Sequence, residues 1–232
     1  MKKNKLIEFD SLYTQSFTGF YFIGIDEVGR GALAGPVIAC AFSWKKKLDF
    51  LLVGSNKSLL ELNDSKQLSK EQREKLYPLL LKLGDFGLGY ASVQEIEKLN
   101  VLNATFLAMK RAYDNLSISR DERDLKPYLL VDGNKFNPYI NCRQSCITHG
   151  DAKSSLIASA SIIAKVYRDL LMRKISKLKR CKKFGWDKNK GYGTLFHRKA
   201  IKKHGITPLH RKLFVRKVFA RLEFSKAKIK SL

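Results

Sequence analysis

The sequence of 232 residues has no long apolar run: no uninterrupted stretch approaches the ~20 residues that a membrane-spanning helix needs. The first 16 residues are basic, and they lack the apolar stretch of roughly 7–15 residues that is typical of a secretory signal. These absences argue against a membrane-spanning helix and a secretory signal, and they lead us to expect a cytoplasmic location.

Cysteine is scarce, and its spacing does not fit a metal site. The four cysteines are Cys40, Cys142, Cys146 and Cys181. Cys142 and Cys146 have no second pair that would complete a tetrahedral zinc site. We therefore expect reduced, structural thiols, as in a reducing compartment.

Acidic residues are also scarce, and their deficit is uneven along the chain. There are 21 acidic against 45 basic residues, which gives a net charge of +24 and a pI of about 9.9. Residues 170–232 carry +19 of this charge, so only +5 belongs to the first 169 residues. Such a charge favours a polyanionic partner, either nucleic acid or an anionic membrane surface, over a basic tail that only aids solubility.

The pattern of apolar and turn residues predicts strands that alternate with helices in the first two thirds of the chain. Ser69 with Gln72, and Ser92 with Glu95, form capping boxes that open helices ending before Gly84 and near residue 115. Short apolar runs bounded by turn residues predict strands at residues 21–26, 36–42, 85–91 and 128–132. This order is typical of an α/β domain.

The last third of the sequence is predicted to be helical. A helix rich in small residues should run from Asp151 to about Leu178 and pack closely against the sheet. A Gly-rich loop, KGYGT, then precedes a short helix that ends at Gly205. Thr207 as N-cap and Pro208 after it predict the start of a last, basic helix.

Three carboxylates stand at the ends of predicted strands. Asp26 and Glu27 follow the first strand, and Asp132 ends the strand at residues 128–132. Hard divalent ions such as Mg²⁺ take oxygen ligands, and a two-metal phosphodiesterase needs several carboxylates at one point. Each acid could instead be a solvated turn residue. The strongly basic background favours the metal site, because acids facing a polyanion need metal between them.

Six motifs in order resemble the type 2 ribonucleases H, the ribonuclease HII family. They cover most of residues 20–215 and comprise GIDEVGRGALAGPV at 24–37, NDSKQLS at 63–69, LLVDG at 129–133, GDAKSSLIASASIIAKVYRD at 150–169, KGYGT with its following His at 190–197, and HR..F at 210–214. The resemblance implies a ribonuclease H-like α/β fold with a mixed central sheet flanked by helices and a helical, basic C-terminal region.

The resemblance also implies a site. Asp26, Glu27, Asp132 and Asp151 would be the catalytic residues and the ligands of two Mn²⁺ or Mg²⁺ ions. A metal-activated water would cut the phosphodiester and leave 3′-hydroxyl and 5′-phosphate ends. Asp169 lies in the same motif, but on one continuous helix it would be ~27 Å from Asp151. We expect Asp169 to pair with Arg168, while Asp151 could also be a plain N-cap.

Five further residues would bind the substrate if the resemblance holds. Gly29, Arg30 and Gly31 would hold the ribonucleotide around its 2′-hydroxyl, although the triplet alone is typical of a tight hairpin turn. Tyr192 would stack on the sugar at the RNA–DNA junction, and Lys66 would contact phosphate; without the resemblance they are a packed aromatic and an exposed lysine. Three histidines are not spaced as metal ligands, and we expect capping or surface roles for His197, His204 and His210.

The prediction is thus a monomeric, metal-dependent endoribonuclease. It would hydrolyse the RNA strand of RNA–DNA hybrids and cut 5′ of single ribonucleotides in duplex DNA. We expect an extension at 1–19, a catalytic domain at 20–215 and a basic helix or tail at 216–232. The alternatives are a non-catalytic basic nucleic-acid-binding protein, a nuclease acting on DNA alone, and a type 3 ribonuclease H, which the short segment before the first motif disfavours.

Overall fold

The computed structural model describes residues 4–45, 57–119 and 125–220, and the chain divides into two compact units. Unit 1 comprises residues 1–28, 37–90 and 105–167. Unit 2 comprises residues 29–36, 91–104 and 168–232. The domain boundaries expected at residues 19 and 215 remain predictions, and residues 221–232 of the expected tail lie outside the described part of the chain.

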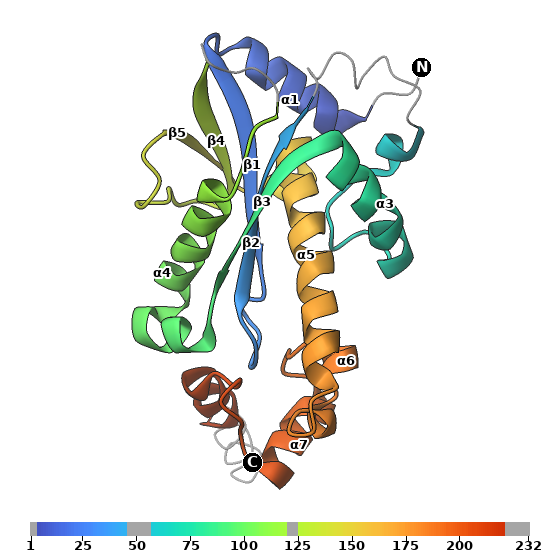
Figure 1. The fold of residues 1–232 in the computed structure, drawn as a ribbon, viewed down its shortest axis with the longest axis vertical. Coiled ribbons are helices and arrows are strands. Elements are labelled where there is room, and N and C mark those ends of the chain that lie inside the picture. Colours follow the sequence, from blue (N-terminus) through green and yellow to red (C-terminus); the bar gives the residue numbers. More distant parts are fainter. Residues whose placement is uncertain (1–3, 46–56, 120–124, 221–232) are drawn as a thin grey trace, which may run out of the picture. The chain divides into compact units, whose positions relative to one another are not determined.

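Unit 1 is built on a mixed five-stranded sheet (Figure 1). The strand order is β3-β2-β1-β4-β5, with β1 antiparallel to β2 and parallel to β4, and β4 parallel to β5. The strands are β1 (Phe20–Val28), β2 (Val37–Trp44), β3 (Gly84–Ala91), β4 (Lys126–Asp132) and β5 (Arg143–Ile147). The four predicted strands are confirmed as β1 to β4, and the mixed sheet confirms the predicted fold class.

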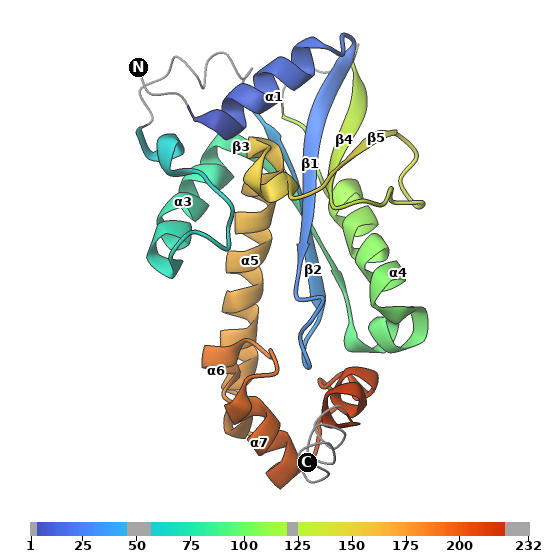
Figure 2. The same ribbon diagram turned by 180° about the vertical axis from the view of Figure 1, so that it is seen from behind.

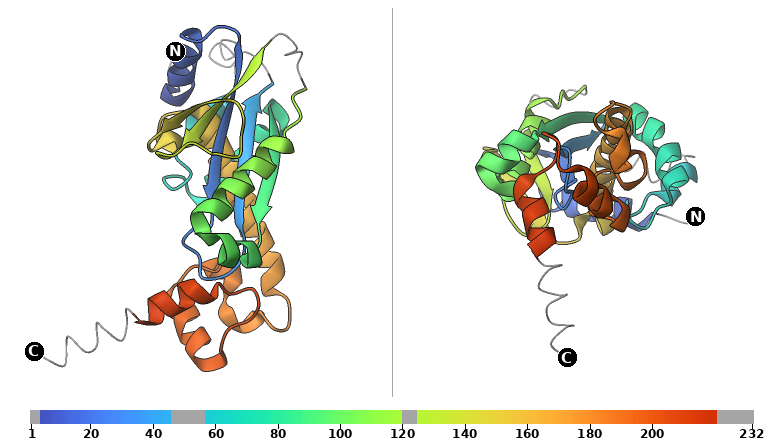
Figure 3. Two further views of the ribbon diagram at one scale, coloured as in Figure 1. Left: turned by 90° about the vertical axis from the view of Figure 1, so that its left-hand side faces the viewer. Right: turned by 90° about the horizontal axis from the view of Figure 1, so that it is seen from below.

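Helices cover both faces of this sheet (Figures 1 and 3). The long helix α5 (Ser155–Ser176) lies against β1, where a Cβ added to Gly24 would be 2.3 Å from the Leu156 carbonyl carbon. On the other face, a Cβ on Gly89 of β3 would be 2.1 Å from the carbonyl oxygen of Ala108 in α4 (Val93–Asp114). The predicted close packing of the small-residue helix is therefore confirmed.

Both predicted capping boxes are present. The Ser69 hydroxyl accepts a hydrogen bond from the Gln72 N–H, and the Gln72 side chain accepts one from the Ser69 N–H, at the start of α3 (Lys70–Leu83). Ser92 and Glu95 make the same reciprocal pair before α4. Asn100 interrupts α4 with φ of 66°, and its side-chain oxygen accepts from the N–H groups two and three residues later.

Two predicted helix starts are wrong. Asp151 lies in a separate 3₁₀ turn, η2 (Gly150–Ala152), and α5 begins at Ser155 because the Ser154 hydroxyl accepts from the Ile157 N–H. Asp151 is therefore not the N-cap of α5. The last helix does not begin at Pro208 but at residue 212, because the preceding segment is held in an extended bridge between His210 and Ala34.

The N-terminal helix α1 (Lys5–Gln15) is an integral part of unit 1 (Figure 2). Asn4 caps it and also donates to carbonyls of the neighbouring 3₁₀ turn η1 (Lys57–Glu61), including that of Leu59 at 2.9 Å. Asp10, which is fully buried, accepts from the Ser155 hydroxyl at 2.6 Å and from the Leu156 N–H at 3.0 Å. The α1 carboxylate thus binds the first turn of α5.

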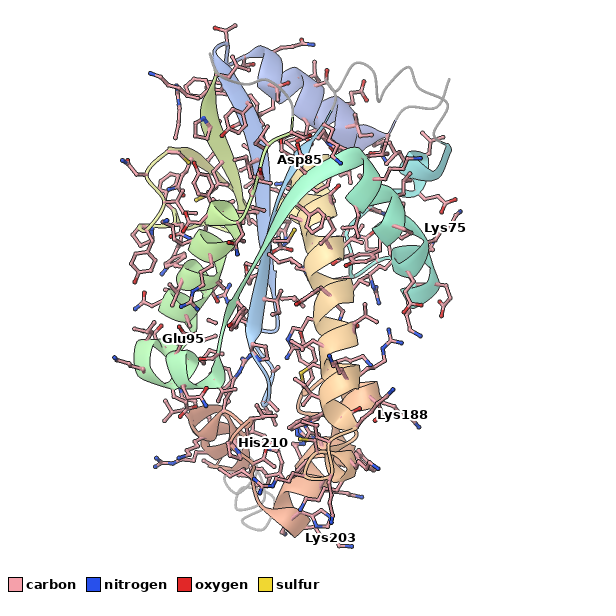
Figure 4. All side chains as sticks on the ribbon, viewed as in Figure 1. Lys75, Asp85, Glu95, Lys188, Lys203 and His210 are labelled. Carbon is pink, nitrogen blue, oxygen red and sulfur yellow. The ribbon has the colours of Figure 1, made fainter. Side chains whose placement is uncertain are left out.

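Unit 2 contains short helices around a small core. They are η3 (Lys182–Phe184), α6 (Trp186–Asn189), α7 (Leu195–His204) and the helix from residue 212 to 220. The buried core is Leu33, Ala34, Met172, Cys181, Phe184, Trp186, Ala200, Ile201 and Val215. Lysines of this unit extend outward from the ribbon, as Lys188 and Lys203 do in Figure 4. The predicted short helix that ends at Gly205 is confirmed as α7.

All four cysteines are free thiols, with Cys40 and Cys181 buried. Among the described residues, no helix is long and apolar enough to cross a membrane.

Candidate active site

The sheet register places two of the predicted acids side by side. Ile25 of β1 pairs with Val131 of the parallel strand β4, so Asp26 and Asp132 are the next residues on two neighbouring strands. Asp26 is only 4% exposed, and Glu27, which follows it, is half-buried. Carboxyl ends of parallel strands are where α/β sheets place functional groups, as the sequence predicted.

Hydrogen bonds hold the carboxylates of Asp26, Asp132 and Asp151 in place. An oxygen of Asp26 accepts from the Glu27 N–H at 2.7 Å, and an oxygen of Asp132 accepts from the Gly150 N–H at 2.7 Å. The Lys66 ammonium donates to Asp151, also at 2.7 Å. Asp151 is 2% exposed, so the turn η2 presents this acid from a buried position.

Electrostatic interactions connect the four acids. Burial raises the pKa of Asp26 well above its ordinary value, and the charges of Glu27 and Asp132 raise it further. Burial also raises the pKa of Asp132, with Asp151 adding to the effect. The hydrogen bond to Asp151 raises the pKa of Lys66. The structure therefore brings together the four predicted acids and Lys66, whose ammonium contacts a carboxylate.

This donor set fits hard divalent cations. Carboxylate oxygens are the ligands that Mg²⁺ and Mn²⁺ take, and mutual repulsion among buried carboxylates is relieved by a cation. Among the described residues, no three acidic, histidine or cysteine side chains are already grouped closely enough to hold an ion. The Lys66 ammonium instead supplies the positive charge at Asp151. The four acids thus supply oxygen ligands at adjoining strand ends and at the turn η2, with Asp26 and Asp132 each held by a main-chain N–H.

The Gly29–Arg30–Gly31 triplet opens the loop at residues 29–36 in unit 2. Gly29 has φ of +92°, a left-handed conformation that favours glycine, and its carbonyl accepts from the Ala32 N–H at 3.3 Å. The Arg30 side chain is exposed, while its carbonyl accepts from Arg211. A turn between antiparallel strands and an exposed guanidinium are thus both present.

Tyr192 is half-buried in the loop before α7. The Arg168 guanidinium carbon lies 5.4 Å from the centre of its ring, and its carbonyl accepts from the Thr194 N–H. Burial lowers the pKa of Arg168, against smaller raising effects of Tyr192 and of the expected partner Asp169, which is half-buried. The hydrogen bonds of the Arg168 side chain go to main-chain carbonyls.

His197 and His210 are buried in unit 2, so a surface position is wrong for both, while His210 Nδ1 accepts from the Thr207 N–H at 2.9 Å in a capping contact. The Trp186 indole N–H donates to His197 Nε2 at 3.0 Å, and His197 Nδ1 lies 2.9 Å from the Tyr192 carbonyl. His197 Nε2 is also 3.2 Å from His210 Nε2, and burial lowers the pKa of His210 to about 4. A motif alone does not distinguish such a packed pair from surface histidines. His204 is exposed, as expected.

Sequence reasoning missed two other residues near the expected substrate-binding groups. Arg168 and Arg211 are fully buried, and both donate to the loop at residues 29–36. Their only sequence signal is their presence within motifs, at residues 150–169 and 210–214. A buried arginine is rare enough that sequence alone predicts an exposed one.

Comparison with known proteins agrees with this description. The family model described as Ribonuclease HII matches residues 23–222. A curated Ribonuclease HII from Fusobacterium nucleatum is 47% identical over 198 residues, which are 84% of this chain and 86% of that protein.

Two solved structures share the fold. The ribonuclease H2 of Pyrococcus horikoshii matches with a TM-score of 0.65 and 25% identity, over 88% of this chain and 99% of that one. Bst-RNase HIII, solved in complex with Mn²⁺, matches with a TM-score of 0.66 and 18% identity, over 90% of this chain and 72% of that one. The chain belongs to the ribonuclease HII family, whose members are metal-dependent endoribonucleases of the ribonuclease H type.

Proposed function

We propose that this enzyme hydrolyses the RNA strand of RNA–DNA hybrids and also cuts duplex DNA on the 5′ side of a single embedded ribonucleotide. The products would carry 3′-hydroxyl and 5′-phosphate ends. The observation that carries the proposal is the convergence of Asp26, Glu27, Asp132 and Asp151 in unit 1, linked by mutual electrostatic effects. We further propose that the enzyme acts as a monomer, with all four acids supplied by one chain.

The proposed cofactors are two divalent cations, Mg²⁺ or Mn²⁺, with these four acids as ligands. When bound, such ions activate a water molecule and neutralise the charge of the leaving oxygen. The oxygen-only donor set supports this choice, and the Mn²⁺ complex of Bst-RNase HIII supports manganese as one of the ions.

The chain's own groups would orient the ligands. The N–H groups of Glu27 and Gly150 each hold one carboxylate oxygen, so these side chains need little reorganisation when a cation binds. The Lys66 ammonium is 2.7 Å from Asp151. A cation at Asp151 would release this ammonium, which would then be available to a substrate phosphate.

The residues of unit 2 would select the substrate. The Gly29–Arg30–Gly31 triplet would hold the ribonucleotide by its 2′-hydroxyl, the group that distinguishes RNA from DNA at one position. Tyr192 would stack on the sugar that follows the ribonucleotide, where a deoxyribose has no extra hydroxyl to accommodate. A site that hydrogen-bonds one hydroxyl rejects a substrate without it strongly, because its polar groups are left unpaired.

Two other functions are less well supported. A non-catalytic nucleic-acid-binding protein would account for the charge of +24 but not for carboxylates buried against each other. A type 3 ribonuclease H is less well supported because the family model that matches residues 23–222 is that of Ribonuclease HII, and the F. nucleatum Ribonuclease HII is 47% identical.

The test is cleavage of a DNA duplex that contains one ribonucleotide, with Mg²⁺ or Mn²⁺ and with a metal-free control. We expect one cut 5′ of the ribonucleotide, and Tyr192→Ala should reduce this cut more than cleavage of an all-RNA strand paired with DNA. If the wild type degrades the hybrid but leaves the single ribonucleotide intact, the proposed substrate choice is wrong and the metal-nuclease assignment survives.

A further inference from the structure

Two arginines with no role in the proposed chemistry, Arg168 and Arg211, have exposed fractions of 0% in unit 2. Placing a guanidinium in a protein interior is costly unless its donors are satisfied. Six side-chain hydrogen bonds satisfy the two groups, and all six go to main-chain carbonyl oxygens. The positions of these accepting carbonyls therefore indicate the role of the two buried arginines.

Arg211 holds two points of the loop at residues 29–36. Its Nη1 donates to the Arg30 carbonyl at 2.7 Å, within the Gly-Arg-Gly triplet. Its Nε and Nη2 both donate to the Gly35 carbonyl, at 3.0 and 2.8 Å. The planar fork of one guanidinium thus fixes the distance between the start and the end of the loop.

Arg168 connects the same loop to the segment that carries Tyr192. Its Nε and Nη2 donate to the carbonyls of Pro36 and Ala34, at 3.0 and 3.1 Å, and its Nη1 donates to the Lys190 carbonyl at 3.0 Å. The same guanidinium lies over the Tyr192 ring, at 5.4 Å from its centre.

Gly29 shows how closely the loop at residues 29–36 approaches the Arg168 guanidinium. A Cβ added to Gly29 would be 2.3 Å from Arg168 Nε. The first glycine of the triplet is therefore required by the buried guanidinium as well as by its positive φ.

The inward carbonyls determine where the opposite N–H groups point. In a trans peptide, the C=O of one residue and the N–H of the next point in opposite directions. The Arg30 carbonyl points toward buried Arg211, so the N–H of Gly31 points away from that guanidinium. Arg30 and Gly31 are both exposed, so this backbone donor belongs to a surface segment that a nucleic acid can approach.

We propose that Arg168 and Arg211 are positioning residues for substrate selection: from the protein interior, they set the conformation of the Gly29–Arg30–Gly31 triplet and the place of the Tyr192 ring. This inference rests on the proposed function, in which those groups recognise the ribonucleotide and the junction. Neither arginine touches substrate, so their effect is on the geometry of groups that do.

Lysine is the informative replacement. Arg211→Lys and Arg168→Lys keep the positive charge but lose the planar fork, so one ammonium cannot reproduce hydrogen bonds to two or three separate carbonyls. Val215→Ala is the matched control. It truncates a core side chain of the same unit that is 8% exposed, and it lowers stability without removing any of the six hydrogen bonds.

The experiment compares two ratios among the wild type, both lysine variants and the control. One is kcat/KM for the single-ribonucleotide duplex divided by kcat/KM for the RNA–DNA hybrid. The other is the affinity for the single-ribonucleotide duplex divided by that for an all-DNA duplex, measured without metal. Each lysine variant should lower the first ratio by about tenfold or more and bring the second toward one, since small misplacements of binding groups have effects of this size. Val215→Ala should keep both ratios.

Both ratios are measured at temperatures at which circular dichroism shows folded protein. A wild type without either preference contradicts the proposed function. A wild type with both preferences, together with lysine variants that keep them, overturns the inference alone. Lysine variants that fold at no temperature, or a control that loses the preferences equally, would mean that the arginines serve stability only.

Discussion

At the scale of the residue, the charge of Asp132 can be removed without removing its hydrogen bond. The Gly150 N–H donates to Asp132 Oδ1 at 2.7 Å, and an asparagine oxygen accepts the same bond. Asp132→Asn should therefore keep the fold and duplex binding while cleavage falls by orders of magnitude, because a charged ligand of the cation site is lost. Single-turnover cleavage at saturating Mg²⁺ or Mn²⁺, with melting and binding curves, measures each part.

Asp169→Asn is the matched control for that variant. Asp169 is a half-buried acid of α5 and belongs to unit 2. The change should lower thermal stability and spare the rate per folded molecule. Turnover of Asp132→Asn near the wild-type rate would remove Asp132 from the ligand set, and a large loss in Asp169→Asn would require a catalytic role for that acid.

Asp10 makes the stability of unit 1 depend on pH. Burial raises its pKa from 3.8 to about 6, against the lowering effect of hydrogen bonds from Ser155 and Leu156. Because the folded pKa is the higher one, the contribution of Asp10 to stability is fully present below pH 4. It is lost as pH rises through 6, a change on the order of 3 kcal/mol. Asp10→Asn, which cannot ionise, should remove this part of the slope.

Chemical unfolding at several values between pH 4 and pH 7.5 measures that slope. Asp114→Asn, at an exposed position on α4, is the control and should leave the slope as in the wild type. An identical slope in Asp10→Asn and wild type would show that the Asp10 carboxyl has no perturbed titration in the folded state.

The sequence contained enough to locate the acids but not the groups that support them. Asp26 and Asp132 end apolar runs, a local pattern that the strands preserve. Arg211 and His210 are charged or polar residues in a basic segment, and only tertiary contacts bury them. The role of Lys66 came from resemblance alone, and its contact with Asp151 spans 85 positions, beyond any local pattern.

At the scale of the element, Gly24 determines how closely α5 approaches β1. A Cβ there would be 2.3 Å from a backbone carbon of Leu156 and 2.5 Å from the Ile157 nitrogen. Backbone atoms inside a helix cannot move cheaply, so Gly24→Ala should destabilise the protein by about 1–3 kcal/mol or more. The measurement is the free energy of unfolding in urea.

Gly31→Ala is the comparison variant, because a Cβ on Gly31 would meet nothing within 4 Å. Its stability should be within about 0.5 kcal/mol of the wild type. Its cleavage of a single-ribonucleotide duplex should nevertheless fall, because the added methyl group stands where substrate is proposed to approach. Equal stability of the two variants would contradict the close packing of α5.

The elements that the sequence predicted well are those with strong local signals. Capping boxes opened α3 and α4, and buried apolar runs formed the central strands. The missed elements have weak signals: β5, at the sheet edge, has only one buried residue, Ile147, and α1 is stabilised by contacts with residues far along the chain. The break at Asn100 was missed because its side chain serves as a local cap within one apolar pattern.

At the scale of the whole molecule, charge should govern affinity for duplexes. Residues 221–232 carry four basic residues and one acidic residue, and they lie outside the described structure. A truncation must come after Ala220, because a cut after Phe214 would remove Val215 from the core of unit 2. The shortened protein should bind with a smaller salt dependence, since each lost phosphate contact removes roughly 0.9 from the slope of log affinity against log salt.

Binding of a labelled duplex at salt concentrations between 50 and 300 mM measures this slope. The remaining basic residues of unit 2, such as Lys188 and Lys203, should preserve most of it. A slope identical to that of the full chain would mean that the last twelve residues do not contact the duplex.

The docking of α1 onto α5 also limits when α1 can reach its native contacts during synthesis of the chain. Asp10 and its partner Ser155 are separated by 145 positions, so α1 cannot complete its contacts until the chain has been synthesised as far as α5. At roughly 5–20 residues per second, that wait is roughly 7–30 seconds. During this time α1 can contact Phe22 and the turn η1, but the Asp10 carboxylate has neither the Ser155 hydroxyl nor the Leu156 N–H to bind. Helix α1 is thus made well before the helix onto which it docks, and chaperones have access to it throughout that interval.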